Sequence, residues 1–257
     1  MFKSKSRFFF LTIATTLLLA IFTSVVSASH SWGNYHWARS SNPFTLNLSN
    51  NTTSDWSEYL LTASDNWSVS SVLNTNIIIG SLKSSKCRAA KGKIEICSKR
   101  YGFNGWLGVT TIWTIGEHIT KSTVEFNDTY FDLIEYDTPT WRRYLTCHEI
   151  GHTFGLAHRD EIFDNTNIGS CLDYTDDPDG IIKGQVTNLQ PDQHDYEELE
   201  FIYSHLDTFS SIKQSFADQN YIADDWGKEI KRIGNQSVFE KKLNKDEKMI
   251  TFVTWVK

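Results

Sequence analysis

The sequence contains no internal repeat and no low-complexity segment, and its charge is not basic. The first absence argues against an architecture of stacked repeats, whose signature is self-similarity at a fixed period. Lysine and arginine number 25 against 31 aspartates and glutamates, which gives a net charge of −6. An acidic chain lacks the basic surface that binds phosphate backbones, so nucleic acid is not an expected partner.

One long apolar run lies at the N-terminus. Basic residues ending at Arg7 precede an apolar stretch over residues 8–26, and Ala28 closes a series of small residues. This layout predicts a secretory signal peptide of residues 1–28, and hence a secreted, extracellular protein with no membrane contact after cleavage. An uncleaved anchor is the alternative, because the run approaches the length that spans a bilayer. Cleavage would remove three basic residues and no acidic one, leaving 22 basic and 31 acidic residues and a net charge of −9.

Cysteine is scarce, with four in the chain. In an exported protein, four cysteines suggest disulfide bonds, with three possible pairings. Cys87 and Cys97 bracket a short basic loop and form the natural first pair. Cys147 and Cys171 would then pair with each other, and free thiols are the alternative.

The stretch over residues 147–160 has a spacing that suits metal binding. His148 and His152 stand four apart, so on an α-helix both imidazoles lie on one face, about one turn apart. Glu149 lies roughly 100° round the helix from His148, where its carboxylate can flank the same cleft. The two imidazoles and the carboxylate therefore belong to one candidate site.

A third histidine follows a glycine. Gly155 permits the left-handed turn that ends a helix, because it has no Cβ, and that turn can bring His158 back towards the first two histidines. Three neutral imidazoles with one open position form a catalytic zinc site, whereas structural sites are usually closed by four protein ligands. The alternative is two ordinary helix histidines, with His158 merely polar.

From His148 to His158 the residues fit H-E-x-x-H-x-x-G-x-x-H, and in this the chain resembles the metzincin metallopeptidases. The resemblance implies an α+β fold with a twisted mixed β-sheet, a backing helix and an active-site helix above a smaller, irregular lower subdomain that ends in a helix. We expect this domain to cover residues 29–207, and residues 208–257 to form a C-terminal extension packed on the lower half. Arg159 matches none of the common branches, so no matrixin-like or astacin-like subfamily is assigned.

Hydrophobic periodicity predicts a strand, a helix, several strands and then two more helices. Thr138 can cap the helix that carries the motif, and Pro139 suits its first position. An apolar stripe from Cys147 to Phe154 would pack under the sheet, so that the histidines face outward. Strands are expected over residues 44–48, 76–79, 93–97, 107–115, 118–126 and 249–256, and helices over 55–67, from 139 through the motif, and from 191 to 206.

By the same resemblance, residues 108–113 form the upper rim of the cleft. There the strand would pair with the backbone of an extended substrate. An ordinary interior strand is the alternative, since β-propensity does not distinguish edge from centre. The expected partner is therefore a protein or peptide substrate, and the oligomeric state is not predicted.

Metzincins carry a tight turn beneath the zinc, centred on a methionine, and the matching stretch here is residues 170–174. Leu172 replaces the methionine, a swap of similar volume that usually costs little, and we expect it to form the floor of the site. Tyr174 lies two residues further on. In the astacin and serralysin branches a tyrosine there can approach the metal or stabilise the transition state. A buried structural tyrosine is the alternative.

Acidic residues cluster around this turn, namely Asp173, Asp176, Asp177 and Asp179. They are hard oxygen ligands and could hold Ca²⁺. The alternative is a solvated acidic loop.

Together these features predict a secreted zinc-dependent endopeptidase. Zn²⁺ on the three histidines would activate water and polarise the peptide carbonyl, and Glu149 would act as general base and then protonate the leaving amine. A secreted zinc-stabilised binding module without catalysis is the second hypothesis, and the intact Glu149 speaks against it. A third is a zinc hydrolase that acts on a small molecule or a non-peptide amide.

Overall fold

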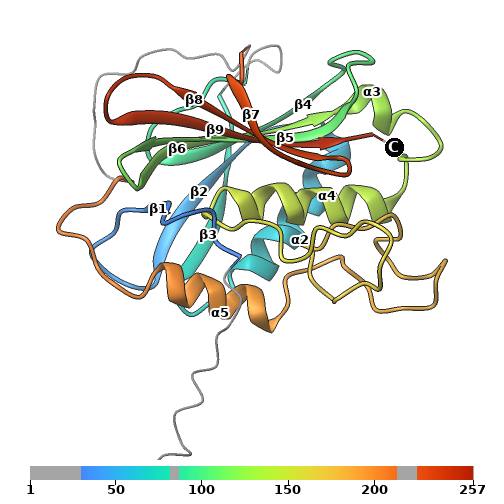
Figure 1. Cartoon of the computed structure of the whole chain (residues 1–257), viewed down its shortest axis with the longest axis horizontal. Coiled ribbons are helices and arrows are strands. Elements are labelled where there is room, and N and C mark those ends of the chain that lie inside the picture. The colour runs from blue at the N-terminus through green and yellow to red at the C-terminus, as the bar shows by residue number, and fades with distance from the viewer. Residues whose placement is uncertain (1–29, 82–86, 213–224, 257) are drawn as a thin grey trace, which may run out of the picture.

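The computed structural model describes residues 30–81, 87–212 and 225–256 (Figure 1). The predicted signal peptide lies outside the described residues. Among the helices that are described, none is long and apolar enough to cross a membrane. In chain order the elements are β1 (His36–Trp37), β2 (Phe44–Asn51), the 3₁₀ turn η1 (Ser54–Trp56), α2 (Ser57–Trp67), β3 (Leu73–Ile79), β4 (Lys93–Lys99), β5 (Trp106–Ile115), β6 (His118–Asn127), α3 (Asp128–Phe131), α4 (Pro139–His152), α5 (Gln193–Ile202), β7 (Lys228–Ile233), β8 (Gln236–Lys242) and β9 (Glu247–Trp255).

The fold is α+β, with one large mixed sheet and few helices. The strand order is β3-β2-β4-β6-β5-β9-β8-β7, and β1 pairs with the start of β6. Neighbouring strands are parallel from β3 through to β6 and antiparallel from β6 through to β7. Figure 1 shows α2 and α4 beneath the sheet and α5 farther from it. The helix that carries the histidines thus lies next to the sheet.

Helix α4 begins where the sequence predicts. Oγ1 of Thr138 accepts a hydrogen bond from the Trp141 amide at 3.2 Å, and Pro139 is the first helical residue. The predicted stripe is buried, and a Cβ on its Gly151 would lie 2.8 Å from the ring of Trp67. Glycine at this point therefore lets α2 approach the backbone of α4 closely.

The core lies between the sheet and helices α2 and α4. Trp56 stacks on Phe126 of β6 with 4.1 Å between ring centroids, and Trp67 meets Phe154 edge-on at 5.5 Å. Burying a side chain such as Phe126 contributes about 1.5–3 kcal/mol. Contacts of this kind fix α4, and with it the histidines, against the sheet.

The helix predicted over residues 191–206 is shorter, because α5 covers Gln193–Ile202. Asp192 caps it: its carboxylate accepts from the amides of His194 and Asp195, while the Asp195 carboxylate accepts from the Asp192 amide. Such a capping box satisfies the first amides of a helix and fixes its start. Sequence reasoning also missed β1, α3, β7 and β8. Strand β7 is largely exposed and has no apolar alternation that would indicate a strand.

Both predicted disulfide bonds are present. Cys87 pairs with Cys97, and Cys147 of α4 pairs with Cys171 in the loop that precedes α5. The second bond joins the helix of the histidines to the turn that contains Leu172. Residues 159–192 otherwise form turns and isolated bridges, which agrees with the predicted irregular segment ahead of a helix.

The predicted rim strand is an interior strand, so the assignment of residues 108–113 to an edge is wrong. Strand β5 pairs with β6 on one side and with β9 on the other. The pairing with β9 runs from Trp106 opposite Trp255 to Ile115 opposite Glu247. The residues of β5 favour a strand equally at an edge and in the centre, so their sequence does not reveal the second neighbour.

The C-terminal extension also differs from the expectation that it packs on the lower half. Residues 228–255 form β7, β8 and β9 of the sheet, although β7 and the turn after it do reach the lower loop. There Lys231 pairs with Glu161, and the Asn235 amide donates to the Tyr174 hydroxyl. An uncovered β5 would expose a row of unpaired backbone groups, and β9 satisfies them.

Candidate metal centre

Helix α4 ends with the first two predicted zinc ligands. His148 and His152 are fully buried. Nδ1 of His148 lies 2.8 Å from the Cys171 carbonyl oxygen, and Nδ1 of His152 lies 2.9 Å from the Leu156 carbonyl oxygen. A carbonyl oxygen only accepts hydrogen bonds, so each Nδ1 carries a proton and each Nε2 presents a lone pair.

Gly155 turns the chain so that His158 meets the other two histidines. Its φ is +95°, and a Cβ there would collide with the Tyr35 carbonyl oxygen. Nε2 of His148 lies 3.2 Å from Nε2 of His152 and 3.2 Å from Nε2 of His158. Nitrogens bound at about 2.0–2.1 Å to a tetrahedral zinc ion lie about 3.3–3.4 Å apart, so the three histidines, here called the triad, fit that ion.

Burial keeps the triad neutral. It lowers the pKa of His148 to about 3, with a smaller contribution from the nearby His158. Burial is also the largest cause that lowers the pKa of His152 and the pKa of His158. Metal ligands must be deprotonated, and lone pairs that face one another without enough protons to share are relieved by a cation between them.

Glu149 is fully buried beside the triad. Its Oε2 accepts a hydrogen bond from Thr110 Oγ1 at 2.6 Å, and its Oε1 accepts one from Thr254 Oγ1 at 2.7 Å. Burial raises the pKa of Glu149 to about 7, against the two hydrogen bonds, which lower it. Gly108 of β5 leaves room for the carboxylate, because a Cβ there would lie 2.5 Å from Oε1.

The three histidines are buried, and β9 covers His152, so the prediction that they face outward is wrong for this conformation. The Phe252 ring stacks on the His152 ring, with 4.4 Å between centroids and 7° between planes. His158 borders an open pocket, whose walls also include Arg159 and Glu161. The burial comes from a strand about a hundred residues away in sequence, which the spacing of the motif does not reveal.

The turn below the histidines carries the two other predicted site residues. Leu172 is fully buried, and its side chain would lie 2.9 Å from a Cβ on Gly151, so it packs directly beneath α4. Tyr174 is buried against Phe163, with 4.6 Å between ring centroids. Burial raises the pKa of Tyr174, and its hydroxyl accepts from the Asn235 amide, which lies in the turn between β7 and β8.

The acidic residues predicted as a calcium site have separate partners. Asp173 accepts from an asparagine side chain at 2.6 Å, and Asp179 accepts from a threonine hydroxyl at 2.8 Å. Asp176 pairs with the Lys183 side chain at 2.6 Å, and Asp177 accepts from the Lys183 amide at 2.8 Å. Across the described ranges, side chains that could share one ion gather at two places, and neither includes these aspartates. Calcium binding by this loop therefore stays a prediction.

One of those two places is the triad, and sequence reasoning missed the other. It consists of His36 in β1 together with His205 and Asp207, which follow α5. The close spacing of His205 and Asp207 is a local signal, but His36 lies 169 residues before His205. Nothing in the sequence around His36 indicates which segment it meets.

Comparison with known proteins adds little to this geometry. No protein-family model and no curated protein matches the sequence. Among solved structures, the chain is similar to one titled "Structure of myroilysin", with 11% sequence identity, coverage of 68% of this chain and 98% of that chain, and a TM-score of 0.39. A likeness at this level assigns no family, so the interpretation of the site rests on its own residues.

Proposed function

We propose that the protein is a secreted zinc-dependent endopeptidase, with the triad as the metal ligands and Glu149 as the general base. The observation that supports this most strongly is the convergence of three Nε2 atoms, with separations of 3.2 Å from His148 to each of the others, beside a buried carboxylate. Three neutral histidine ligands leave the open position that catalytic zinc sites require.

Zn²⁺, when bound, supplies a Lewis acid that lowers the pKa of water to about 7 and polarises a carbonyl group. Glu149 takes a proton from the attacking water and later delivers it to the leaving amine. A base with a pKa of about 7 is well matched to proton transfer near neutral pH. Thr110 holds Oε2, so Oε1, which Thr254 now occupies, is the oxygen that takes the proton.

In this structure the C-terminal extension contacts the groups to which we assign catalysis. Thr254 donates to Glu149, and the ring of Phe252 lies on a zinc ligand. Strand β9 also takes the side of β5 on which an extended peptide could pair. We infer that hydrolysis requires β9 to separate from β5, and that the described form is latent.

Tyr174 is proposed as a second catalytic group. The extension engages it too, since its hydroxyl accepts from the Asn235 amide. Separation of the extension would free this hydroxyl to donate to the oxygen of a substrate carbonyl, where negative charge develops. A purely structural tyrosine is the alternative.

Secretion and the substrate class are proposed from other features. The apolar run at the N-terminus suggests export, and two disulfide bonds are typical of proteins in oxidising compartments. The motif that resembles the metzincins suggests a protein or peptide substrate, which could pair with β5 only after β9 has separated. The excess of acidic residues argues against nucleic acid.

The second candidate function is a secreted zinc-stabilised binding module without catalysis. The full burial of Glu149 favours it, because a carboxylate bonded to Thr110 and Thr254 has no access to substrate. Against it, a scaffold that only holds a metal has no need of a buried carboxylate, and desolvating one is unfavourable.

The test is hydrolysis of casein and of a quenched-peptide library by residues 29–257, with and without a chelator. Wild type, Thr254→Val and Glu149→Ala are compared at equal zinc content. Chelator-sensitive cleavage by the first two proteins, and none by the third, supports the peptidase. Zinc on the triad without cleavage by wild type or Thr254→Val favours the binding module.

A further inference from the structure

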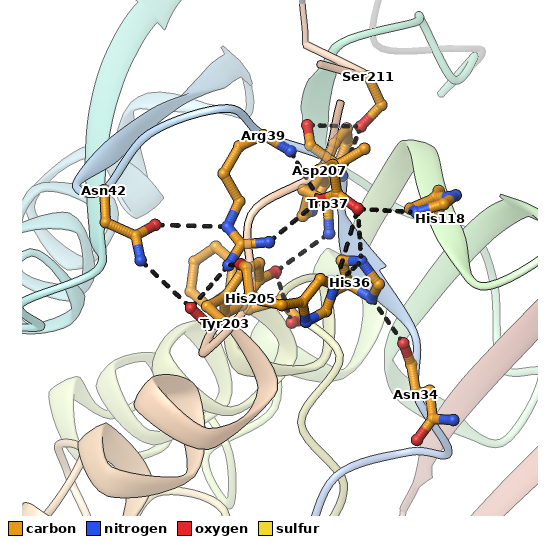
Figure 2. A network of polar contacts seen from close by, with 12 residues as sticks. Asn34, His36, Trp37, Arg39, Asn42, His118, Tyr203, His205, Asp207 and Ser211 are labelled. Atoms are coloured by element: carbon orange, nitrogen blue, oxygen red, sulfur yellow. Dashed lines mark hydrogen bonds and ion pairs between the residues drawn. The ribbon is translucent and has the colours of Figure 1, made fainter. Parts of the chain in front are cut away.

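Asp207 lies in a second group of side chains that could ligate a metal ion, and Figure 2 shows the contacts among them. Nε2 of His36 lies 3.2 Å from Nε2 of His205, and Oδ1 of Asp207 lies 3.5 Å from the first nitrogen and 3.7 Å from the second. These separations are close to the roughly 3.3–3.4 Å expected between donor atoms around a tetrahedral zinc ion. We call His36, His205 and Asp207 the cluster.

Neighbouring contacts orient two of the three donors. Nδ1 of His36 lies 2.7 Å from the Asn34 carbonyl oxygen, so Nδ1 carries the proton and Nε2 presents a lone pair. Arg39 donates to Oδ2 of Asp207 from its backbone amide and from its guanidinium, both at 3.1 Å. The other oxygen, Oδ1, therefore faces the imidazoles. Metal ligands typically have such outer hydrogen bonds, which fix their orientation.

His118 of β6 supports the same carboxylate. Its Nε2 lies 3.1 Å from Oδ1 of Asp207. Figure 2 marks this contact with a dashed line. It does not join the three donor atoms that lie within 4.8 Å of one another. We therefore assign His118 as a positioning residue that holds Asp207, and not as a ligand.

A cation accounts for this arrangement better than a single hydrogen bond does. Nε2 of His36 presents a lone pair, and Oδ1 of Asp207 keeps lone pairs beyond the one that accepts from His118. A neutral His205 has at most one proton on Nε2 and can donate it to only one of these two atoms. One ion can bind all three donor atoms together, and their separations of 3.2–3.7 Å fit this arrangement.

We propose that the cluster binds a divalent transition metal ion, zinc in the first instance, at a site separate from the triad. Two imidazoles and one carboxylate suit zinc, whereas calcium and magnesium take oxygen ligands. The proposal does not depend on the endopeptidase function, because no residue is shared between the two sites.

The ion would reinforce a junction between distant parts of the chain. The segment of β1 and the segment after α5 already share backbone hydrogen bonds, from the Asp207 amide to Arg39 and from the Ser211 amide to Ala38, both at 2.9 Å. An ion that binds only the folded chain stabilises it, because binding free energy adds to the free energy of unfolding. The role assigned to this metal is therefore structural.

The experiment counts zinc ions in single-histidine variants of residues 29–257. His205→Ala is the informative change, because the His205 side chain is 54% exposed and its loss leaves the core untouched. His194→Ala is the matched control, since His194 lies on α5 outside both groups of ligands. Each protein is stripped with a chelator and given Zn²⁺ alone. Bound metal is then measured by mass spectrometry after gel filtration, and melting temperatures are recorded with and without zinc.

We expect two equivalents of zinc in wild type and His194→Ala, and one equivalent in His205→Ala with a smaller zinc-induced rise in melting temperature. His118→Ala should keep the site but weaken it about 10–100-fold, as the loss of an outer hydrogen bond does. His205→Gln, which lacks the imidazole but keeps a polar side chain, repeats the comparison if circular dichroism shows that alanine disturbs the fold.

Equal zinc content and equal melting shifts in wild type, His205→Ala and His205→Gln would overturn the proposal. The failure of the two proposals can also be told apart. If wild type binds a single ion that His205→Ala abolishes, the cluster is a metal site and the triad is not. If wild type binds a single ion, and every variant with a substitution in the cluster still binds it, the ion is not at the cluster. The cluster is then only a hydrogen-bonded histidine–carboxylate network.

Discussion

The triad and the cluster are built in opposite ways. The triad comes from one helix and the turn after it, and its side chains are almost completely buried. The cluster joins segments 169 residues apart and leaves His205 half exposed. The carboxylate beside the triad accepts from two threonine hydroxyls, whereas the carboxylate of the cluster is held by a guanidinium.

This difference suits the two groups to the different roles that we propose for them. Glu149 is held by neutral threonine hydroxyls, so its proton affinity is set by burial and it can exchange a proton. Asp207 is paired with Arg39 and serves better as a fixed ligand than as a base. The triad is suited to chemistry that the extension can cover, and the cluster is suited to holding two segments together.

The largest effect is expected from a substitution that removes the proposed general base and leaves the metal of the triad in place. Glu149→Ala should lower kcat about 10²–10⁴-fold, the range attributed to general acid–base catalysis, with zinc content unchanged. The exposed Glu58→Ala on α2 is the control for loss of a carboxylate. Steady-state hydrolysis and metal analysis measure both quantities. Undiminished turnover by Glu149→Ala would mean that Glu149 is not the general base, and the proposed chemical difference between the two sites would be lost.

Tyr174→Phe tests whether the hydroxyl held by the extension belongs to catalysis. We expect kcat to fall about 10²-fold, as it does on loss of one donor to a developing oxyanion, with little change in KM. Tyr203→Phe is the control, because that buried hydroxyl bonds the Phe154 carbonyl and the Trp37 amide instead. A lower melting temperature with normal kcat would assign Tyr174 a structural role alone.

Thr254→Val tests the cover over the triad. A hydrogen bond to a charged group contributes about 1.5–3 kcal/mol, so its loss should raise the population with β9 separated, and with it hydrolysis, by at least about tenfold. Thr251→Val is matched, because Thr251 lies on the same strand and bonds Thr111, away from Glu149. The two variants are compared for hydrolysis and for hydrogen exchange of β9. An equal rise in both would mean general loosening and not release of Glu149.

The smallest expected effect is a difference in the rate at which the two sites lose metal. The cluster should release zinc to a chromophoric chelator before the triad does, because His205 is exposed while the triad lies under β9. Two kinetic phases are expected in wild type, and His205→Ala should lack the faster one. Loss of the slower phase in that variant would reverse the assignment.

Much of the fold could be predicted because it depends on neighbours in the sequence. Thr138 and Pro139 fix the start of α4 through the first amides of the helix, and the spacing of His148 and His152 follows from the helix repeat. The strands with strong β-formers, β5 and β6 above all, lie where they were predicted. The polar strand β7 gave no such signal, and α5 was predicted too long because its start is set by Asp192.

The triad, its adjacent carboxylate and the glycine that turns the chain towards the third histidine could all be predicted from the sequence, since local backbone geometry places them. Three contacts could not be predicted: β9 pairs with β5, Thr254 bonds Glu149, and His36 meets Asp207. Strand propensity is the same at an edge and in the centre, and a lone histidine carries no record of its distant neighbours. Contacts between remote segments arise only when the whole core packs.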